Sequence, residues 1–187
     1  MRLIQAAHEE FLRDGFRGAS VDRIAASAGV AKQTLYNNFP SKEALFAETV
    51  RAGTRAVVVK LDDGSGDVRE RLVAYGQALR AKLLSPEGLA WFRTLVADLP
   101  RLPQLGRIVL REGPMETQRH LAAFLAARMD SGELRRDDPI FAAEMLNGML
   151  LNSDRTRGLF ADDTVVLTEP ARVERILDCF LRAFRPE

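Results

Sequence analysis

The sequence is poor in the residues that form disulfides, metal sites and many catalytic centres. Its 187 residues include one cysteine, Cys179, and two histidines, His8 and His120. A single cysteine cannot form an intramolecular disulfide, and without a Cys pair or a Cys/His cluster the chain has no structural zinc motif. We therefore expect a fold that needs neither metal nor cofactor, in the reducing cytoplasm.

Motifs for catalysis are missing as well. The two histidines fall in separate predicted helices, and the chain has no Gly-rich phosphate loop, HExxH pair or nucleophile elbow. Cys179 lies beside an apolar stripe, where a lone thiol usually acts as a small hydrophobic side chain; an oxidant sensor is the alternative. We predict that the protein is not an enzyme and has no catalytic residue.

Long apolar runs and alternating runs are both absent. A membrane-spanning helix needs about 18 to 20 apolar residues in succession, and the N-terminal residues form an amphipathic pattern instead of a signal peptide. We therefore expect a soluble, unexported protein with no membrane partner. Apolar residues recur at helical spacing almost throughout, and no run has the strict alternation of a half-buried strand. This pattern predicts an all-α fold.

Capping residues and prolines give the expected helix boundaries. Ser20 and Ser41 can each accept the free backbone N–H groups of a first helical turn, whereas Gly15 and Gly29 are placed to end helices in a left-handed conformation. Asp138 and Thr168 are also predicted to cap helices, because a proline follows each of them closely and proline is favoured in the first helical turn. The segments 62–66 and 157–168 are predicted to be a break and a loop. The predicted helices span about 3–14, 21–28, 32–39, 42–59, 67–84, 86–98, 102–112, 114–130, 138–156 and 170–184.

Charge is distributed unevenly although the net charge of the chain is only +1. Residues 1–60 hold nine Lys and Arg against six Asp and Glu, a net charge of +3, and the remaining residues carry a net charge of −2. The first third therefore favours a phosphate-bearing partner, although only mildly.

A helix-turn-helix pattern lies in this first third. Two short helices that pack at a steep angle need a small residue at their contact and a glycine at the turn, and Ala25 and Gly29 have that spacing. Ile24, Val30 and Leu35 are then the apolar residues that face the shared core.

The second of these helices carries polar side chains that suit DNA. No acidic residue interrupts the segment 32–38, although a merely solvated helix, the alternative, usually mixes both signs. Gln and Asn can read adenine in the major groove, whereas Lys, Thr and Tyr more often contact phosphate. Lys42 adds a basic side chain at a helix N-terminus, a good phosphate site. The candidate DNA-binding residues are Ser20, Lys32, Gln33, Thr34, Tyr36, Asn37, Asn38 and Lys42.

The stretch from Ile4 to Val50 closely resembles the DNA-binding domain of the TetR family of regulators. The resemblance implies a homodimer whose third helices enter the major groove of operator DNA. It also implies a DNA-binding domain over residues 1–48 and a linking helix into an effector-binding and dimerisation domain over 49–187, about nine helices in all. Ala31 departs from the family, which usually has a capping Ser or Thr there. The matching positions are Ala6, Ala7, Phe11, Gly15, Phe16, Ser20, Ile24, Ala25, Ala28, Gly29, Val30, Thr34, Leu35, Tyr36, Phe39, Ser41, Lys42, Glu43 and Leu45.

The C-terminal part resembles the AefR-like type of TetR C-terminal domain more weakly. This resemblance rests on residues 97–101, 113–114, 132–134 and 137–139 within the segment 91–152. It implies that the last two helices form the dimer interface, with an intramolecular core as the alternative. The candidate interface residues are Phe141, Met145, Gly148, Val173, Ile176, Leu177, Phe180, Leu181 and Phe184.

A small-molecule effector is the expected ligand of the C-terminal domain. Aromatic and thioether side chains can wall an adaptable apolar cavity, although at helical spacing such residues also form plain core. The candidate pocket residues are Trp91, Phe92, Met115, Phe124, Met145 and Met149. They favour a hydrophobic or aromatic effector that releases a repressor from its operator. A DNA-binding dimer that answers to a protein partner, or that has no effector, is the alternative.

Overall fold

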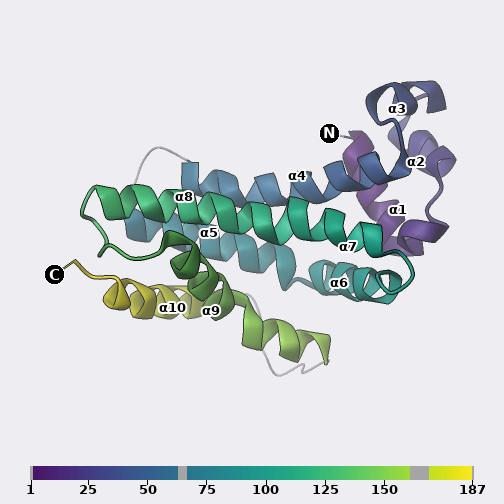
Figure 1. Cartoon of the computed structure of the whole chain (residues 1–187). Helices are drawn as coiled ribbons and strands as arrows, with labels where there is room; N and C mark the ends of the chain where they lie inside the picture. The colour runs from purple at the N-terminus through teal and green to yellow at the C-terminus, as the bar shows by residue number, and fades with distance from the viewer. Residues whose placement is uncertain (1, 63–66, 161–168, 187) are drawn as a thin grey trace. The chain divides into compact units, whose positions relative to one another are not determined.

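The structure is a computed structural model that describes residues 2–62, 67–160 and 169–186, which form helices joined by short turns (Figure 1). Because no β-strand occurs within these ranges, the predicted all-α class is confirmed. The helices are α1 (Arg2–Gly18), α2 (Val21–Ala28), α3 (Lys32–Asn38), α4 (Lys42–Asp62), α5 (Val68–Leu83), α6 (Pro86–Asp98), α7 (Pro103–Leu110), the π-helical segment η1 (Arg111–Met115), α8 (Glu116–Asp130), α9 (Pro139–Leu159) and α10 (Pro170–Ala183).

Local capping chemistry sets several of these boundaries as predicted. Ser20 accepts a hydrogen bond from a first-turn N–H of α2, and Gly29 ends that helix with φ 70° and ψ 33°. The Asp138 carboxylate accepts two first-turn N–H groups of α9. Ala31 gives α3 no side-chain cap, so α3 depends on packing against its neighbours.

Gly15 has the positive φ expected for the end of a helix, and it separates the main part of α1 from a last turn. With φ 66° and ψ 178°, Gly15 kinks α1, and helical hydrogen bonding resumes as far as Gly18. A side chain at this φ would be strained, whereas glycine tolerates it. The predicted end of the first helical segment near residue 14 is therefore confirmed, and one further helical turn follows the kink.

The chain divides into two compact units, and each unit is formed by two separate segments of the sequence. The first unit contains residues 1–54 and 90–114, and the second contains residues 55–89 and 115–187. Helices α4 and α6 each contribute residues to both units. The functional boundary predicted near residue 48 stays a prediction, because the units are defined by packing alone.

The core of the first unit is centred on aromatic side chains. Phe11, Phe16 and Phe46 are buried, with ring centroids 5.2 to 5.8 Å apart. Leu35 of α3 and Ile24 of α2 are fully buried and belong to the same core. This core fixes the helix-turn-helix segment on α1 and α4.

The core of the second unit is formed by α5, α8, α9 and α10 together with the end of α4. Helix α8 packs along α9, and α10 packs against α5. Gly76 allows the second of these approaches, because a Cβ there would lie 2.9 Å from Val173 Cγ1 and 3.1 Å from Leu150 Cδ2. A larger residue at position 76 would separate α5 from its neighbours.

Some sequence expectations fall partly outside the described residues. Of the predicted break at 62–66, residues 63–66 lie outside, as do residues 161–168 of the predicted loop, including the Thr168 cap. Residues 157–159 are described and continue α9 instead of beginning the loop. Within the described ranges, no helix combines the length and apolarity needed to cross a bilayer.

Candidate nucleic-acid interface

Helices α2 and α3 meet at a tight turn whose backbone hydrogen bonds are satisfied. The Gly29 N–H donates to Ala26 O at 3.1 Å, and the Val30 N–H donates to Ala25 O at 3.0 Å. Ala25 and Ala28 are buried where the helices pack. This is the geometry that the sequence predicted for a helix-turn-helix.

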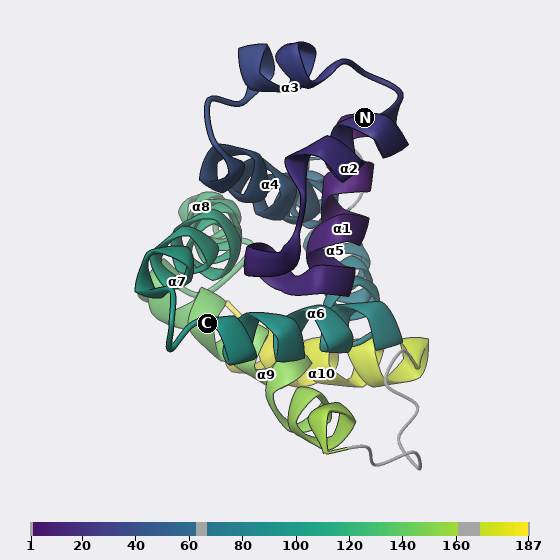
Figure 2. The same ribbon diagram turned by 90° about the vertical axis from the view of Figure 1, so that its right-hand side faces the viewer.

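Helix α3 presents its polar side chains to solvent. Leu35 is its one buried residue, and the six candidate DNA-binding residues of the helix are all exposed. Figure 2 shows α3 at the edge of the first unit, with α1, α2 and α4 on one side of it. The helix therefore has a face available for a duplex, and Tyr36, 40% exposed, belongs to that face.

Several of these side chains bond to one another or to their own helix. Gln33 Nε2 donates to Asn37 Oδ1 at 3.0 Å, one helical turn away. Asn38 Nδ2 donates to the backbone oxygen of Thr34 at 2.7 Å. To read a base edge with both hydrogen-bonding groups, Gln33 and Asn37 must exchange their mutual bond for bonds to DNA.

An acidic residue lies on this face although α3 itself has none. Asp22, in the first turn of α2, forms an ion pair with Lys32, with 2.8 Å between Asp22 Oδ1 and Lys32 Nζ, and both side chains are exposed. The hydrogen bond and charge of Asp22 raise the pKa of Lys32. From the sequence, Asp22 was assigned only to the N-terminus of α2. Its pairing with Lys32 was not predicted, because the two residues are ten positions apart on different helices and helical periodicity does not relate them.

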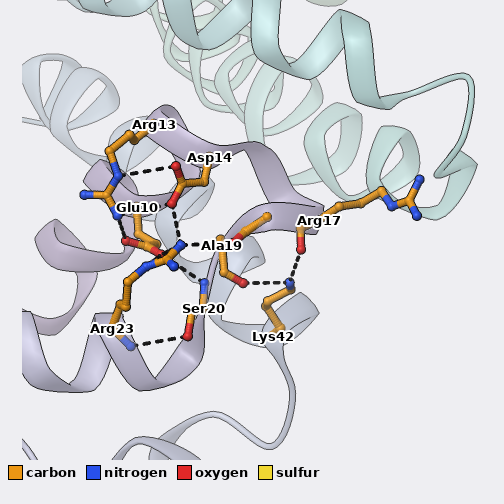
Figure 3. A network of polar contacts seen from close by, with 9 residues as sticks. Glu10, Arg13, Asp14, Arg17, Ala19, Ser20, Arg23 and Lys42 are labelled. Carbon is orange, nitrogen blue, oxygen red and sulfur yellow. Dashed lines mark hydrogen bonds and ion pairs between the residues drawn. The ribbon is translucent and has the colours of Figure 1, made fainter.

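Lys42 is turned toward the end of α1. Its Nζ donates to Ala19 O at 3.0 Å and to Arg17 O at 3.3 Å, and it lies 4.7 Å from the centre of the Phe16 ring. Burial lowers the pKa of Lys42. The predicted phosphate ligand is thus also a cation that caps the carbonyl end of α1 (Figure 3).

Ser20 is held by a network of charged residues that the sequence did not reveal. Glu10 is buried, and its carboxylate accepts the Ser20 N–H at 3.0 Å and Arg23 Nε at 2.7 Å. Arg13 also pairs with Glu10, and Arg23 bridges to Asp14 (Figure 3). The available signal was the position of Glu10 three residues after Ala7, on the apolar face of α1.

The electrostatics of Glu10 favour its charged form. Burial by itself would raise the pKa of Glu10, but hydrogen bonds from Arg23 and from the Ser20 N–H, with the charges of Arg13 and Arg23, lower it overall. The carboxylate therefore stays ionised and ties α1 to the start of α2.

The six candidate pocket residues are distributed over both units. In the first unit, Trp91 and Phe92 are half-buried on α6, and Trp91 stacks on Phe46 with centroids 5.8 Å apart. In the second unit, Phe124 is buried in the core and Met145 is partly buried against it.

The two remaining methionines are on the surface of the second unit. Met115 and Met149 are 54% and 38% exposed. Met149 lines an open hollow of about 550 Å³ on the outer side of α9, with Gly148, Asn152, Ser153, Thr156 and Arg157. The pocket assignment therefore stays a prediction.

The candidate interface residues separate into two groups. On α9, Phe141 is 55% exposed, Gly148 is exposed and Met145 is half-buried. On α10, Ile176 and Leu181 are partly buried and pack against the core of the second unit. The remaining candidates, on α10 and at its C-cap, are at most 2% exposed within a single chain and so contribute to the intramolecular core that the sequence left open as the alternative: Val173, Leu177, Phe180 and Phe184.

Family models match both parts of the chain. Residues 3–49 match the model of bacterial regulatory proteins of the tetR family, and residues 70–186 match that of the AefR-like transcriptional repressor C-terminal domain. The HTH-type transcriptional repressor SCO4008 of Streptomyces coelicolor is 31% identical over 137 residues, which cover 71% of this chain and 64% of that repressor.

Solved structures agree with these matches over almost the whole chain. A TetR-family regulator from Mesorhizobium loti superposes with a TM-score of 0.78 at 28% identity, over 98% of this chain and 95% of that one. The flavonoid-responsive regulator FrrA superposes with a TM-score of 0.68 at 30% identity, over 100% of this chain and 96% of that one.

Proposed function

Since this chain belongs to the TetR family of DNA-binding transcriptional regulators, we propose that it is a repressor released from its operator by a small hydrophobic or aromatic effector. The observation that carries the DNA-binding part of this proposal is the exposed face of α3. Gln33, Tyr36 and Asn37 are all exposed, and Leu35 is the one buried residue of the helix. A helix of this kind fits the major groove, where amide side chains pair with adenine.

The proposed roles of the DNA-binding candidates on α2 and α3 follow from their positions. Gln33 and Asn37 read bases, because both are exposed amides one turn apart on α3. Thr34 lies next to Gln33 and Asn38 lies next to Asn37 on the same helix. Lys32 and Tyr36 add contacts to phosphate. Ser20 begins α2 and is held there by Glu10.

The proposed assembly is a homodimer that places two copies of α3 in successive major grooves. Half-sites on one face of B-DNA lie about 34 to 36 Å apart. The exposed face of α9 supports dimerisation, because Phe141 is 55% exposed and no atom would lie within 4 Å of a Cβ at Gly148. A glycine in mid-helix costs about 0.5 to 1 kcal/mol relative to alanine, and packing within the chain does not explain that cost here. A partner helix that approaches at Gly148 does.

The proposed effector is apolar because the candidate pocket side chains are aromatic or thioether groups. FrrA, named as flavonoid-responsive, is 30% identical to this chain over its whole length, which supports a planar aromatic class. We propose that the effector favours a dimer whose α3 helices no longer match the half-site spacing.

Selection of bound sequences from a random duplex pool tests the DNA-binding proposal. We expect an inverted repeat with half-sites about one helical turn apart. Thermal shifts of the full-length chain across a panel of flavonoids and other apolar metabolites then test the effector. A compound that raises the melting temperature and dissociates the protein from its operator supports repression by effector release. If no compound stabilises the protein while operator binding is intact, a protein partner or the absence of an effector is favoured.

A further inference from the structure

Asp98 reaches from the last residue of α6 to the kink in α1. Its Oδ2 accepts the backbone N–H of Phe16 at 2.9 Å, across 82 residues of sequence. Both residues belong to the first compact unit. The same oxygen would lie 3.0 Å from a Cβ at position 15, so a side chain there would crowd the Asp98 carboxylate in addition to straining the positive φ.

The kink leaves a backbone donor that Asp98 satisfies. Because Gly15 has non-helical dihedrals, the turn that follows it begins like a new helix, with N–H groups that lack helical acceptors. A carboxylate at such an N-terminal end accepts a hydrogen bond and interacts favourably with the local dipole. Asp98 thus acts as a cap supplied by another helix.

Lys42 binds the opposite end of the same turn. Its ammonium contacts the carbonyl oxygens of Arg17 and Ala19, where a cation is favoured. An anion from α6 and a cation from α4 therefore hold residues 16–19 at their two ends. The next residue, Ser20, is the N-cap of α2.

We propose that Asp98 is a positioning residue for DNA recognition. By fixing residues 16–19, it sets where α2 begins and hence how α3 is presented to the duplex. The inference rests on the proposed function of α3. It implies that the DNA-binding unit includes the end of α6 and is not contained in residues 1–48.

The test compares full-length wild type with Asp98→Ala and Asp98→Asn. Asparagine keeps an oxygen that can accept the Phe16 N–H, whereas alanine removes it. Asp130→Ala is the matched control, because Asp130 is an exposed carboxylate that pairs with Arg136 at 3.3 Å in the second unit. Each variant is assayed for binding to the selected operator and to random duplex, at a temperature where circular dichroism shows it folded. Hydrogen exchange of the Phe16 amide is measured on the same samples.

Positioning predicts a loss of specificity and not a general loss of binding. Asp98→Ala should weaken operator binding by about tenfold, the effect of one hydrogen bond to a charged acceptor, and should leave random-duplex binding unchanged. Its Phe16 amide should exchange faster. Asp98→Asn should recover most operator affinity and most amide protection, and Asp130→Ala should match wild type.

Two results would overturn the inference. One is operator affinity of Asp98→Ala close to that of wild type while the Phe16 amide loses its protection. The other is an equal loss on operator and random duplex in both Asp98 variants. Failure of the wild type to select any sequence is a separate result, since it removes the proposed function itself before any variant is compared. If Asp98→Ala does not fold, Asp98→Leu replaces it, because leucine also removes the acceptor of the Phe16 N–H while keeping a side chain of similar length, and the same two criteria apply.

Discussion

Gln33 Nε2 donates to Asn37 Oδ1 at 3.0 Å, so the two amide side chains proposed to read bases hold each other in the free protein. The bond orders both side chains on the exposed face of α3 before DNA arrives. It also makes their contributions interdependent, because DNA binding must replace the bond that they share.

Substitution of either amide should change sequence preference. Gln33→Ala and Asn37→Ala should each cost about 1 to 3 kcal/mol of discrimination at the bases they contact and should change random-duplex affinity little. Because the residues are bonded to each other, the losses should not add in the double variant. Binding titrations on operators with single base changes measure both effects. Additive losses that are equal at every base position would contradict shared reading.

Removal of Asp22 should strengthen binding to DNA of any sequence. Asp22 lies 2.8 Å from Lys32 and repels phosphate, so Asp22→Asn should free one cation on the DNA-facing surface. We expect a several-fold tighter affinity for random duplex and a steeper dependence on salt, by about one released counterion. Titrations of wild type and Asp22→Asn at several salt concentrations give both quantities. An unchanged salt slope would show that Asp22 does not hold Lys32 away from phosphate in the wild-type complex, and would contradict this prediction.

Lys42 should have a measurable role in stability in addition to any phosphate contact. Two of the three N–H donors of its ammonium bind the carbonyl oxygens of Arg17 and Ala19 at the end of α1. Lys42→Met removes these bonds while keeping an apolar stem, and should lower the free energy of unfolding by about 1 to 3 kcal/mol. If the third donor contacts phosphate, the variant should also reduce the salt slope by about 0.9. Urea unfolding and salt titrations separate the two roles; a stable variant with a reduced slope would leave only the phosphate contact.

Ionisation of Glu10 should stabilise the protein above its unfolded pKa. The folded-state pKa of Glu10 is lowered, so its favourable contribution is present above the ordinary value of 4.5 and is lost as the pH falls toward the folded value. Glu116 titrates in the same direction, because Arg119 and then His120 lower its pKa to about 2. Glu10→Gln should therefore reduce the acid limb, which is the fall in the free energy of unfolding as the pH is lowered below about 4.5.

Glu116→Gln is the matched control for that pH experiment. It should flatten the acid limb without changing operator specificity, since Glu116 lies on α8. Glu10→Gln should change specificity as well, because Glu10 holds the backbone of Ser20. An unaltered acid limb in Glu10→Gln would contradict the proposed charge network.

Gly148 offers a test of the dimer that separates folding from assembly. Apart from the adjacent backbone of α9, a Cβ at this position would meet no atom of the described residues within 4 Å. Gly148→Ala should therefore stabilise the helix by about 0.5 to 1 kcal/mol, and Gly148→Leu should be tolerated by the single chain. If a partner helix approaches there, Gly148→Leu should weaken the dimer. Sedimentation equilibrium measures that effect, and dimers of equal strength would place the interface elsewhere.

Local features could be predicted from the sequence because their causes are local. The cap at Ser20, the left-handed turn at Gly29 and the cap at Asp138 depend on residues within one helical turn. So does the exposure of the α3 side chains around Leu35. Helical periodicity together with capping residues was therefore sufficient to place these elements.

Contacts between distant segments could not be predicted in this way. Asp98 and Phe16 are 82 residues apart, and nothing in either segment identifies the other. The apolar stripe of α10 shows why burial is also ambiguous: periodicity predicted that the stripe would be covered, but not whether its own chain or a partner would cover it. In the structure, Phe180 is covered by its own chain.

The most direct test of the central claim uses an operator in which 7-deazapurines replace the purines of each half-site. This change removes the N7 acceptors of the major groove and leaves the phosphates and the minor groove unaltered. We predict that the wild type binds the altered operator about tenfold or more weakly than the unaltered one. The double variant Gln33→Ala/Asn37→Ala should bind the two operators with nearly the same affinity. Equal affinity of the wild type for both operators would contradict the proposal that α3 reads DNA through the major groove.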